Sequence, residues 1–456
     1  MIDETRVQLL NDLELNRRGK YVLYWMQASQ RAKFNHALEF AIARANEMGL
    51  SLIVCFGLMD DYPEANERHY AFMIEGLREV EADLRGRRIK LVVKRGSPAK
   101  VALHYAKRAS IVVCDSGYTR HQKRWREEVG AGARCSVIQV ESDVVIPVET
   151  VSDHQEFAAR TIRPKIHKLL ARYLAPLAAS RIKHASLASS VTGDLDLSTA
   201  IDQLKLDRTV ARSSHFVGGR RAALARLDEF IRTKLQGYAD GRNEPVAAQT
   251  STMSPYLHFG NISPIEIALR VRDSGKGSAE DRASYLEELI VRRELGVNFV
   301  YYSAKYDSFD ALPRWAKQTL RQHARDRRPV TYSLAQLESS ATHDPYWNAA
   351  QTQMTRTGFM HNYMRMYWGK KIIEWTRSPR KAFEIALHLN NRYFIDGRDP
   401  VSYQNVAWLF GLHDRPWGPA RKIFGTVRYM NEAGLRRKFD MDAYVRSVQA
   451  LQSSEE

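Results

Sequence analysis

Five short runs of consecutive apolar residues alternate with helix-like segments in the first 150 residues, and this pattern constrains the fold more than any other feature. The runs lie at 21–26, 51–56, 89–93, 110–114 and 136–141, and helical periodicity lies at 31–48, 70–84 and 98–107. Strands that are apolar on both faces and alternate with helices are typical of a covered parallel sheet. The pattern predicts a doubly wound, Rossmann-like α/β domain over residues 18–150. No glycine-rich fingerprint follows the first run, so an NAD site is unsupported.

Strand signals nearly vanish in the second half of the chain. Residues 151–218 have weak periodicity and many Ala, Ser and Lys residues from about 176 onward, so we expect an inter-domain connection with short helices. Helical segments follow at 219–235, 263–273, 280–300, 313–325, 333–340, 345–376 and 379–391, with a break near Gly358. These segments predict a second, all-α domain over residues 219–445.

The composition is that of a basic, globular protein. The chain has 456 residues, too many for one typical core, and a formal net charge of +17, which attracts polyanions such as DNA, RNA or anionic lipid. No apolar run is long enough to cross a membrane, and residues 1–16 do not resemble a secretory signal. Cys55, Cys114 and Cys135 lack metal-ligand spacing. We therefore expect a cytoplasmic protein with reduced thiols, no metal site and no membrane association.

Aromatic and polar residues gather in the C-terminal helical part. Trp368 and Trp375 are two helical turns apart, so both rings lie on nearly one helix face, which Arg365 shares. The simplest interpretation is an aromatic core stripe. An apolar helix face, however, seldom admits His361, Asn362 and Arg365 unless these side chains bind something. The polar residues therefore favour a binding site over a plain core.

Six long motifs carry a more specific signal. They read SPYLHFGNIS, EELIVRRELGVNF, THDPYWNAAQ, TGFMHNYMRMYWGKKIIEW, LNNRYFIDGRDP and RYMNEAGLRRKFD. Together they resemble class II cyclobutane pyrimidine dimer photolyases, a branch of the photolyase/cryptochrome family, from about Tyr21 to Phe439. The resemblance implies an antenna-type α/β domain joined to a helical FAD-binding domain. It also implies a light-driven enzyme, a deoxyribodipyrimidine photo-lyase, that acts as a monomer on double-stranded DNA containing pyrimidine dimers.

The resemblance further implies cofactors and their residues. FAD is the expected cofactor, and the N-terminal domain could hold an antenna pigment of the 8-hydroxy-deazaflavin type. The FAD-binding set comprises Tyr238, Thr250, Ser251, Thr252, Met253, Ser254, Asn362, Arg365, Asp396 and Asp399. Within it, 250–254 would hold the phosphates, and Arg365 and Asp396 would form an ion pair beside the flavin ring. Asn390 would stand next to the reactive N5 edge, and Trp368, Trp347 and Trp375 would carry electrons, with Trp375 near solvent.

The same resemblance implies a set of residues that bind the lesion and the DNA. Glu288 would hydrogen-bond the flipped dimer, and Trp408 would stack on it. Met366 and Tyr367 would line the pocket, and Trp417 and Arg428 would fill the gap in the duplex. Arg242 would pair with Asp414 at the rim, and Arg292 would make an ionic contact where some members carry Trp.

Three other functions remain open at this point. A cryptochrome-like photoreceptor often carries a long C-terminal extension, whereas about 17 residues follow Phe439. A (6-4) photoproduct photolyase needs histidine chemistry at the lesion, whereas the motif places His361 with the flavin. A non-enzymatic flavoprotein that binds DNA would not need Glu288 or Trp408. The motifs favour repair of cyclobutane dimers.

Overall fold

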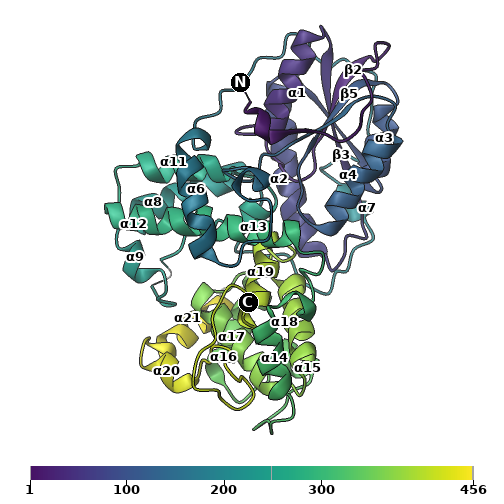
Figure 1. The fold of residues 1–456 in the computed structure, drawn as a ribbon. Helices are drawn as coiled ribbons and strands as arrows, with labels where there is room; N and C mark the ends of the chain where they lie inside the picture. The colour runs from purple at the N-terminus through teal and green to yellow at the C-terminus, as the bar shows by residue number, and fades with distance from the viewer. Residues whose placement is uncertain (1, 248, 454–456) are drawn as a thin grey trace.

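The computed structural model describes residues 2–247 and 249–453, and its N-terminal part is an α/β sheet domain (Figure 1). Six strands within these residues form one sheet in the order β1-β6-β5-β2-β3-β4. Strands β2 to β6 pair in parallel, and β1 pairs antiparallel with β6. The strands are β1 (Val7–Leu9), β2 (Tyr21–Trp25), β3 (Ser51–Leu58), β4 (Lys90–Arg95), β5 (Ala109–Asp115) and β6 (Val137–Val140).

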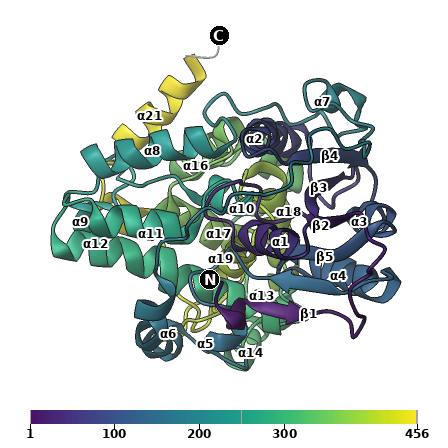
Figure 2. The ribbon, with the colours of Figure 1, turned by 90° about the horizontal axis from the view of Figure 1, so that it is seen from above.

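Alternate residues of the central strand β2 enter two different cores. Val22 and Tyr24 pack with residues of α1 (His36–Glu47) and α2 (Glu67–Gly86). Leu23 and Trp25 pack on the other face with residues of α3 (Pro98–Ala106) and α4 (Arg120–Gly132). Figure 2 shows these two pairs of helices on either side of the strands. The predicted doubly wound sheet is therefore confirmed.

Two elements of this domain were not predicted. Strand β1 precedes residue 18 and has only three residues, too few for an alternating pattern to stand out. Helix α4 is strongly polar, and its buried face is little more than Trp125 and Val129. The domain division at residues 150 and 218 stays a prediction.

Outside the sheet, the regular elements of the described chain are helices, as predicted, and irregular stretches such as 174–199 and 410–431 connect them (Figure 1). Helices α5 to α13 run beside the sheet domain, and the later helices form the other end of the molecule. Their bounds are α5 (Val148–Val151), α6 (Ala159–Tyr173), α7 (Ala200–Gln203), α8 (Arg220–Thr233), α9 (Tyr238–Gly241), α10 (Ser254–His258), α11 (Pro264–Asp273), α12 (Ala279–Leu286), α13 (Arg293–Tyr302), α14 (Arg314–Gln322), α15 (Leu334–Glu338), α16 (Pro345–Thr357), α17 (Asn362–Trp375), α18 (Pro379–Tyr393), α19 (Pro400–Leu409), α20 (Glu432–Arg436) and α21 (Met441–Ser453).

Two predicted helices have informative interruptions. The segment 280–300 contains a π-helical stretch, η2 (Glu287–Arg292), between α12 and α13. Such π turns are frequent at functional sites. The predicted break near Gly358 separates α16 from α17, because Gly358 adopts a left-handed conformation with φ of 78°. A Cβ at Gly358 would lie 2.5 Å from Ile395 Cγ1, so the tight approach also requires glycine.

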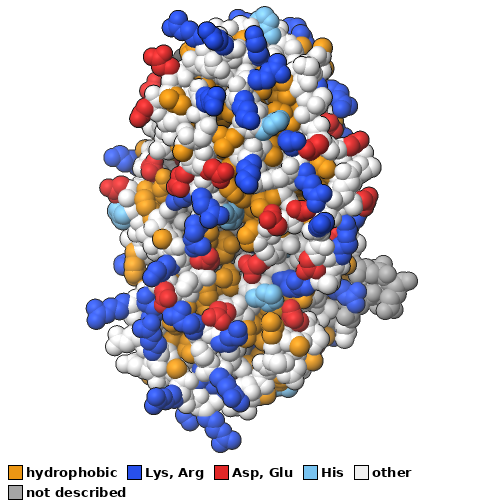
Figure 3. All heavy atoms as spheres, turned by 90° about the vertical axis from the view of Figure 1, so that its right-hand side faces the viewer, with side chains coloured by type: hydrophobic (Ala, Val, Ile, Leu, Met, Phe, Trp, Pro, Cys, Tyr) orange, Lys and Arg blue, Asp and Glu red, His pale blue; other side chains and the backbone are white. Residues whose placement is uncertain are grey.

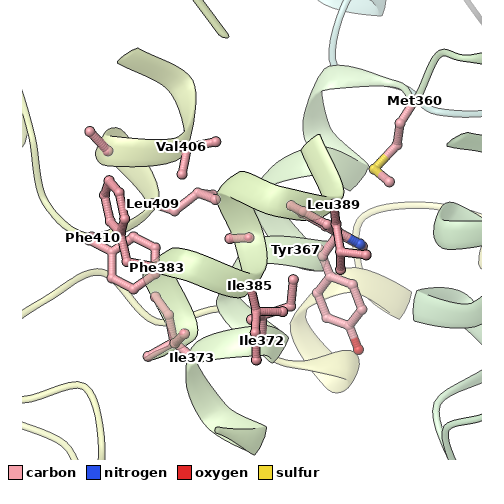
Figure 4. Close-up of a cluster of buried hydrophobic side chains, with 14 of the residues drawn as sticks. Met360, Tyr367, Ile372, Ile373, Phe383, Ile385, Leu389, Val406, Leu409 and Phe410 are labelled. Atoms are coloured by element: carbon pink, nitrogen blue, oxygen red, sulfur yellow. The ribbon is translucent and has the colours of Figure 1, made fainter. Parts of the chain in front are cut away.

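Helices α17, α18 and α19 enclose a dense apolar core, part of which Figure 4 shows. Tyr367 belongs to this core with Ile372, Ile385 and Leu389. Basic side chains are interspersed with acidic ones on the face shown in Figure 3. Within residues 2–247 and 249–453, no helix has the length and apolar character that a bilayer span needs.

Candidate functional site

A cavity inside the helical part collects most of the predicted cofactor residues. Its empty space, counting the open mouth, is about 1000 Å³. We call it the helix pocket; its lining includes Tyr238, Thr250, Ser251, Thr252, Met253, Ser254, Leu257, Tyr285, Glu288, Leu289, Arg293, Phe359, Met360, Asn362, Arg365, Asp396, Asp399, Val401, Ser402 and Asn405. All ten residues of the predicted FAD-binding set are among them, although they come from four separate stretches of the chain.

One wall of the helix pocket is a loop rich in hydroxyl groups. Residues 250–252 lead into α10, and Thr252 has φ of 53°, a conformation that non-glycine residues seldom adopt. The Tyr285 hydroxyl donates to Ser251 Oγ at 3.0 Å, which ties the loop to α12. Hydroxyl groups on a constrained loop suit the binding of phosphate oxygens, and strained backbone often occurs at ligand sites.

A second wall carries an ion pair. Arg365 Nη2 donates to Asp396 Oδ1 at 3.2 Å, and both side chains are 11% exposed. The Arg365 guanidinium also lies 3.7 Å from the centroid of the Phe394 ring. Asn362 adds an amide to the same cavity. The pair therefore places a hydrogen-bond donor, the guanidinium, beside an acceptor, the carboxylate. These two groups fit the donors and acceptors at the polar edge of a planar heterocycle.

Asp399 and Asn390 lie at the back of the pocket. Asp399 Oδ1 accepts the Val401 amide at 2.8 Å and so caps α19, while Asp399 Oδ2 lies 3.3 Å from His258 Nδ1. Burial raises the pKa of Asp399, but His258, Arg293 and the Val401 amide together hold that pKa below its usual value. Asn390 is not part of the lining. It is 1% exposed and contacts the lining residue Ser402 at 2.9 Å through Nδ2.

Glu288 stands on η2 and lines the helix pocket beside the cofactor set. Arg242 Nη1 lies 2.7 Å from Glu288 Oε1, and both side chains are about one third exposed. The predicted pairing of Arg242 with Asp414 is therefore wrong. Glu288 on η2 lies next to Arg242, the residue that follows α9, whereas Asp414 contacts Trp417 and Arg428.

Asp414 belongs to a separate cluster of aromatic and basic residues. It accepts from Trp417 Nε1 at 3.1 Å and lies 3.7 Å from Arg428 Nε. The Arg428 guanidinium covers the Trp417 ring at 4.3 Å and the Trp408 ring at 5.9 Å. Trp417 is 37% exposed. The structure thus joins four of the residues predicted to meet DNA into one surface.

The other residues predicted to contact the lesion occupy different positions. Met366 lines a shallow hollow together with Trp417 and Arg428. Tyr367 is fully buried and donates to Asp344, so its predicted role in lining the lesion pocket is wrong; the ring points into the core instead. Arg292 forms an ion pair with Glu287 at 3.2 Å, and its contact with the lesion or the DNA stays a prediction.

The three predicted electron carriers form a connected group. The Trp347 and Trp375 rings are 5.5 Å apart, and Trp347 Nε1 donates to the Trp368 carbonyl at 3.0 Å. Trp368 follows Arg365, a lining residue, by one turn of α17. The prediction that Trp375 lies near solvent is wrong, because this residue is 1% exposed and packs beneath Tyr332.

Several lining residues were not singled out from the sequence. Arg293 follows Arg292 directly, and its Nη1 donates to the Asp143 carbonyl at 2.6 Å. Ser402 and Asn405 are polar positions on helix α19, which contains five strongly apolar residues, so their polarity was a usable sequence signal: Val401, Val406, Ala407, Trp408 and Leu409. His361 was expected with the flavin, but it borders a neighbouring hollow behind residues 250–252 and caps α17 through Nδ1.

A second cavity lies at the carboxyl ends of β2 and β3. We call it the sheet pocket; its lining includes Trp25, Met26, Gln27, Ala28, Gln30, Phe56, Gly57, Leu58, Met59, Tyr62, Ala65, His69, Tyr70, Met73, Pro98, Gln122, Trp125, His258, Phe259 and Arg398. The strand order reverses beside β2, and ligands of open α/β sheets bind at such a point. Buried polar atoms of Trp25, Gln27, Gln30 and Arg398 have no hydrogen-bond partner among the described residues. Such atoms are rare unless a ligand or water satisfies them.

The fold is that of known photolyases. The crystal structure of a class III photolyase from Agrobacterium tumefaciens superposes with a TM-score of 0.71 at 20% identity, covering 94% of this chain and 86% of that one. An archaeal photolyase from Sulfolobus tokodaii, whose structure holds two FAD molecules, gives 0.69 at 16% identity, covering 93% and 89%.

The sequence comparisons identify the family. Residues 22–182 match the family model described as DNA photolyase. The deoxyribodipyrimidine photo-lyase of Methanothermobacter thermautotrophicus is 51% identical over 99% of both chains. That of Potorous tridactylus is 38% identical over 98% of this chain and 85% of its own. The chain belongs to the DNA photolyase family, which confirms the family resemblance and the prediction of a lyase.

Proposed function

We propose that this protein repairs cyclobutane pyrimidine dimers in DNA by light-driven electron transfer from reduced FAD bound in the helix pocket. The observation that carries the proposal is that one cavity holds both the cofactor set and Glu288. An electron donor and a group that recognises the lesion must lie close together for electron transfer. The sequence relatives named deoxyribodipyrimidine photo-lyase support the same function.

The residues of the helix pocket fit FAD in their chemistry. The hydroxyl groups of residues 250–254 suit the phosphates, and Arg365, Asp396 and Asn362 suit the polar edge of the flavin ring. When bound and photoexcited, reduced FAD supplies one electron, which returns after the two cyclobutane bonds of the dimer have opened. No net oxidation or reduction results.

The protein's own part is to bind, orient and enclose the lesion. The basic chain attracts the duplex through its phosphates. A cyclobutane dimer stacks poorly, so turning it out of the helix costs less than turning out intact bases. Glu288 can then accept a hydrogen bond from a base edge through Oε2 while Oε1 keeps its 2.7 Å contact with Arg242. Trp417 and Arg428 would fill the space that the dimer leaves.

The sheet pocket is the proposed site of an antenna pigment. Its walls are aromatic and apolar, and its unpartnered donors and acceptors suit a planar heterocycle with amide-like edges. An 8-hydroxy-deazaflavin meets that description. The Sulfolobus tokodaii structure holds two FAD molecules, which shows that this fold can carry two chromophores.

A repair assay tests the proposed function. Purified protein with reduced FAD is incubated with an oligonucleotide containing one thymine cyclobutane dimer, under blue or near-ultraviolet light and in darkness. We expect intact thymines only in the light. A (6-4) photoproduct oligonucleotide is the substrate control and should remain unrepaired. Equal repair in darkness, or none in light, would refute the proposal and leave a photoreceptor as the alternative.

A further inference from the structure

The segment 390–399 forms a shared wall between the two pockets. Asp396 and Asp399 line the helix pocket, whereas Arg398 lines the sheet pocket. The turn is tight, because a Cβ at Gly397 would lie 2.8 Å from the Asn390 carbonyl oxygen. Arg398 itself has φ of 69°, in the left-handed region that favours glycine. The backbone here is therefore held in an uncommon shape that directs neighbouring residues into different cavities.

A hydrogen-bond network runs through this wall from Arg398 to Asn390. The Arg398 amide donates to Asn391 Oδ1 at 3.2 Å, and Arg398 Nη1 donates to the Asn391 carbonyl at 2.7 Å. Asn391 Oδ1 also accepts from Asn390 Nδ2 at 3.0 Å. Asn390 Nδ2 further donates to Ser402 Oγ at 2.9 Å, and Ser402 lines the helix pocket. The network thus crosses the wall without a gap.

Burial makes this network rigid. Asn390, Asn391 and Arg398 are 1%, 0% and 3% exposed, so water cannot replace a lost partner easily. Asn391 is also anchored to the other domain, because its Nδ2 donates to Glu64 Oε2 at 2.5 Å. The orientation of the Asn390 amide is therefore set by Asn391, and the position of Asn391 is set by Arg398 and Glu64.

At the sheet pocket, the network ends in Arg398, which, within the described chain, has a donor without an acceptor. Arg398 Nε is buried and has no hydrogen-bond partner among the described residues. Its Nη1 lies 3.1 Å from His69 Nε2, and His69 lines the same pocket. An occupant with a carbonyl or anionic oxygen would give Arg398 Nε the missing acceptor. Such a contact would shift the Arg398 guanidinium, which donates a hydrogen bond to the Asn391 carbonyl.

We propose that Asn391 and Arg398 are positioning residues that fix the Asn390 amide directly behind Ser402, a lining residue of the helix pocket, and make its orientation respond to the occupant of the sheet pocket. The inference rests on the proposed function, because it takes FAD to occupy the helix pocket. A reoriented amide dipole beside a redox cofactor changes the relative stability of its oxidised and reduced forms.

A double-mutant cycle on the FAD-loaded protein tests the first claim, that Asn391 positions the Asn390 amide. The midpoint potential of bound FAD is measured by redox titration for the wild type, Asn390→Ala, Asn391→Ala and the double variant. We expect both single variants to shift the potential in the same direction. The expected shift is about 30 mV, which is a tenfold change for a two-electron couple. The double variant should shift no further than the larger single one, because both changes break one network.

Three results would overturn the claim that Asn391 positions the Asn390 amide. These are a wild-type potential in Asn391→Ala, additive shifts in the double variant, or an equal shift in the control Tyr62→Phe. Tyr62 lines the sheet pocket, but its hydroxyl contacts His121 and lies outside the network. If Asn391→Ala does not fold, Asn391→Ser goes through the same cycle. Failure of the wild type to bind FAD would overturn the proposed function instead.

Titration with 8-hydroxy-5-deazariboflavin tests the second claim, that the occupant of the sheet pocket affects the FAD site through Arg398. Saturation of the sheet pocket, followed by the probe's own absorbance, should shift the FAD potential in the wild type. The shift should be smaller in Arg398→Lys, which keeps the charge but loses the guanidinium geometry. Binding of the probe without a shift, an equal shift in Arg398→Lys, or no binding would each overturn the coupling between the pockets.

Discussion

The substitution Asp396→Asn removes one charge from the ion pair in the helix pocket and keeps the shape of the side chain. Arg365 then remains as a buried cation with an amide in place of its counter-ion. Removing one partner of a buried pair costs about 3–5 kcal/mol. The lower part of that range applies here, because Arg365 keeps its 3.7 Å contact with the Phe394 ring and some exposure to water. We expect a loss of about 3 kcal/mol of folding stability.

The same change should weaken FAD binding. A lost hydrogen bond to a charged group costs about 1.5–3 kcal/mol, which corresponds to a Kd for FAD that rises about 10–100-fold. Urea unfolding followed by tryptophan fluorescence measures the stability, and titration of the apoprotein with FAD measures the Kd. Asp310→Asn is the matched control, because Asp310 pairs with Arg380 at 2.8 Å on the surface. That variant should behave like the wild type.

A double variant separates stability from binding. Arg365→Met with Asp396→Asn removes both charges, so the folding stability should largely return. The FAD affinity should stay low, because the pocket has lost its cation and anion. The reasoning is refuted if Asp396→Asn leaves both quantities unchanged, or if the double variant binds FAD as tightly as the wild type.

Three further predictions follow from single residues. Trp347→Phe should abolish most of the light-driven reduction of oxidised FAD while repair by chemically reduced enzyme persists; absorbance under illumination measures this, with Trp315→Phe as the control that should behave as wild type. Glu288→Gln should lower kcat/KM for dimer repair about 10–100-fold without changing FAD affinity, and an equal loss in Glu287→Gln would contradict this role. Burial lowers the pKa of Lys370 to about 7, with Asp414 raising it and Arg428 lowering it. Between about pH 7 and 10 the unfolded chain therefore binds more protons, so wild-type stability should rise with pH by up to about 1.4 kcal/mol per unit. Urea midpoints of Lys370→Met should lack this slope, and an unchanged slope would contradict the assignment.

Local patterns were sufficient for most of the secondary structure, apart from β1 and α4, and for much of the site. The five apolar runs became parallel strands, and the break at Gly358 fell where glycine punctuates a helix. The ten residues of the predicted FAD set line one cavity, and half of them lie in long motifs that could be recognised on their own: Ser254, Asn362, Arg365, Asp396 and Asp399. A sequence pattern predicts structure reliably when its signal lies within a few helical turns or one strand.

Side-chain contacts between segments far apart in the chain could not be predicted from the sequence. Arg242 pairs with Glu288 and not with Asp414, because only the packed structure decides which carboxylate faces it. Trp375 is buried because Tyr332, more than forty residues earlier, covers it. Neither pairing leaves a periodicity or a spacing that could be read from the chain.

The sequence by itself determined the two kinds of architecture, the order of the elements and the family. The tertiary structure alone decided which side chains face a pocket, which pair with each other and which stand one layer behind. Asn390 illustrates the difference, because its motif was evident but its position behind Ser402 was not. The physical reason is that local free energies select helices and strands, whereas the orientation of a buried polar group depends on partners such as Glu64, 327 residues away from Asn391.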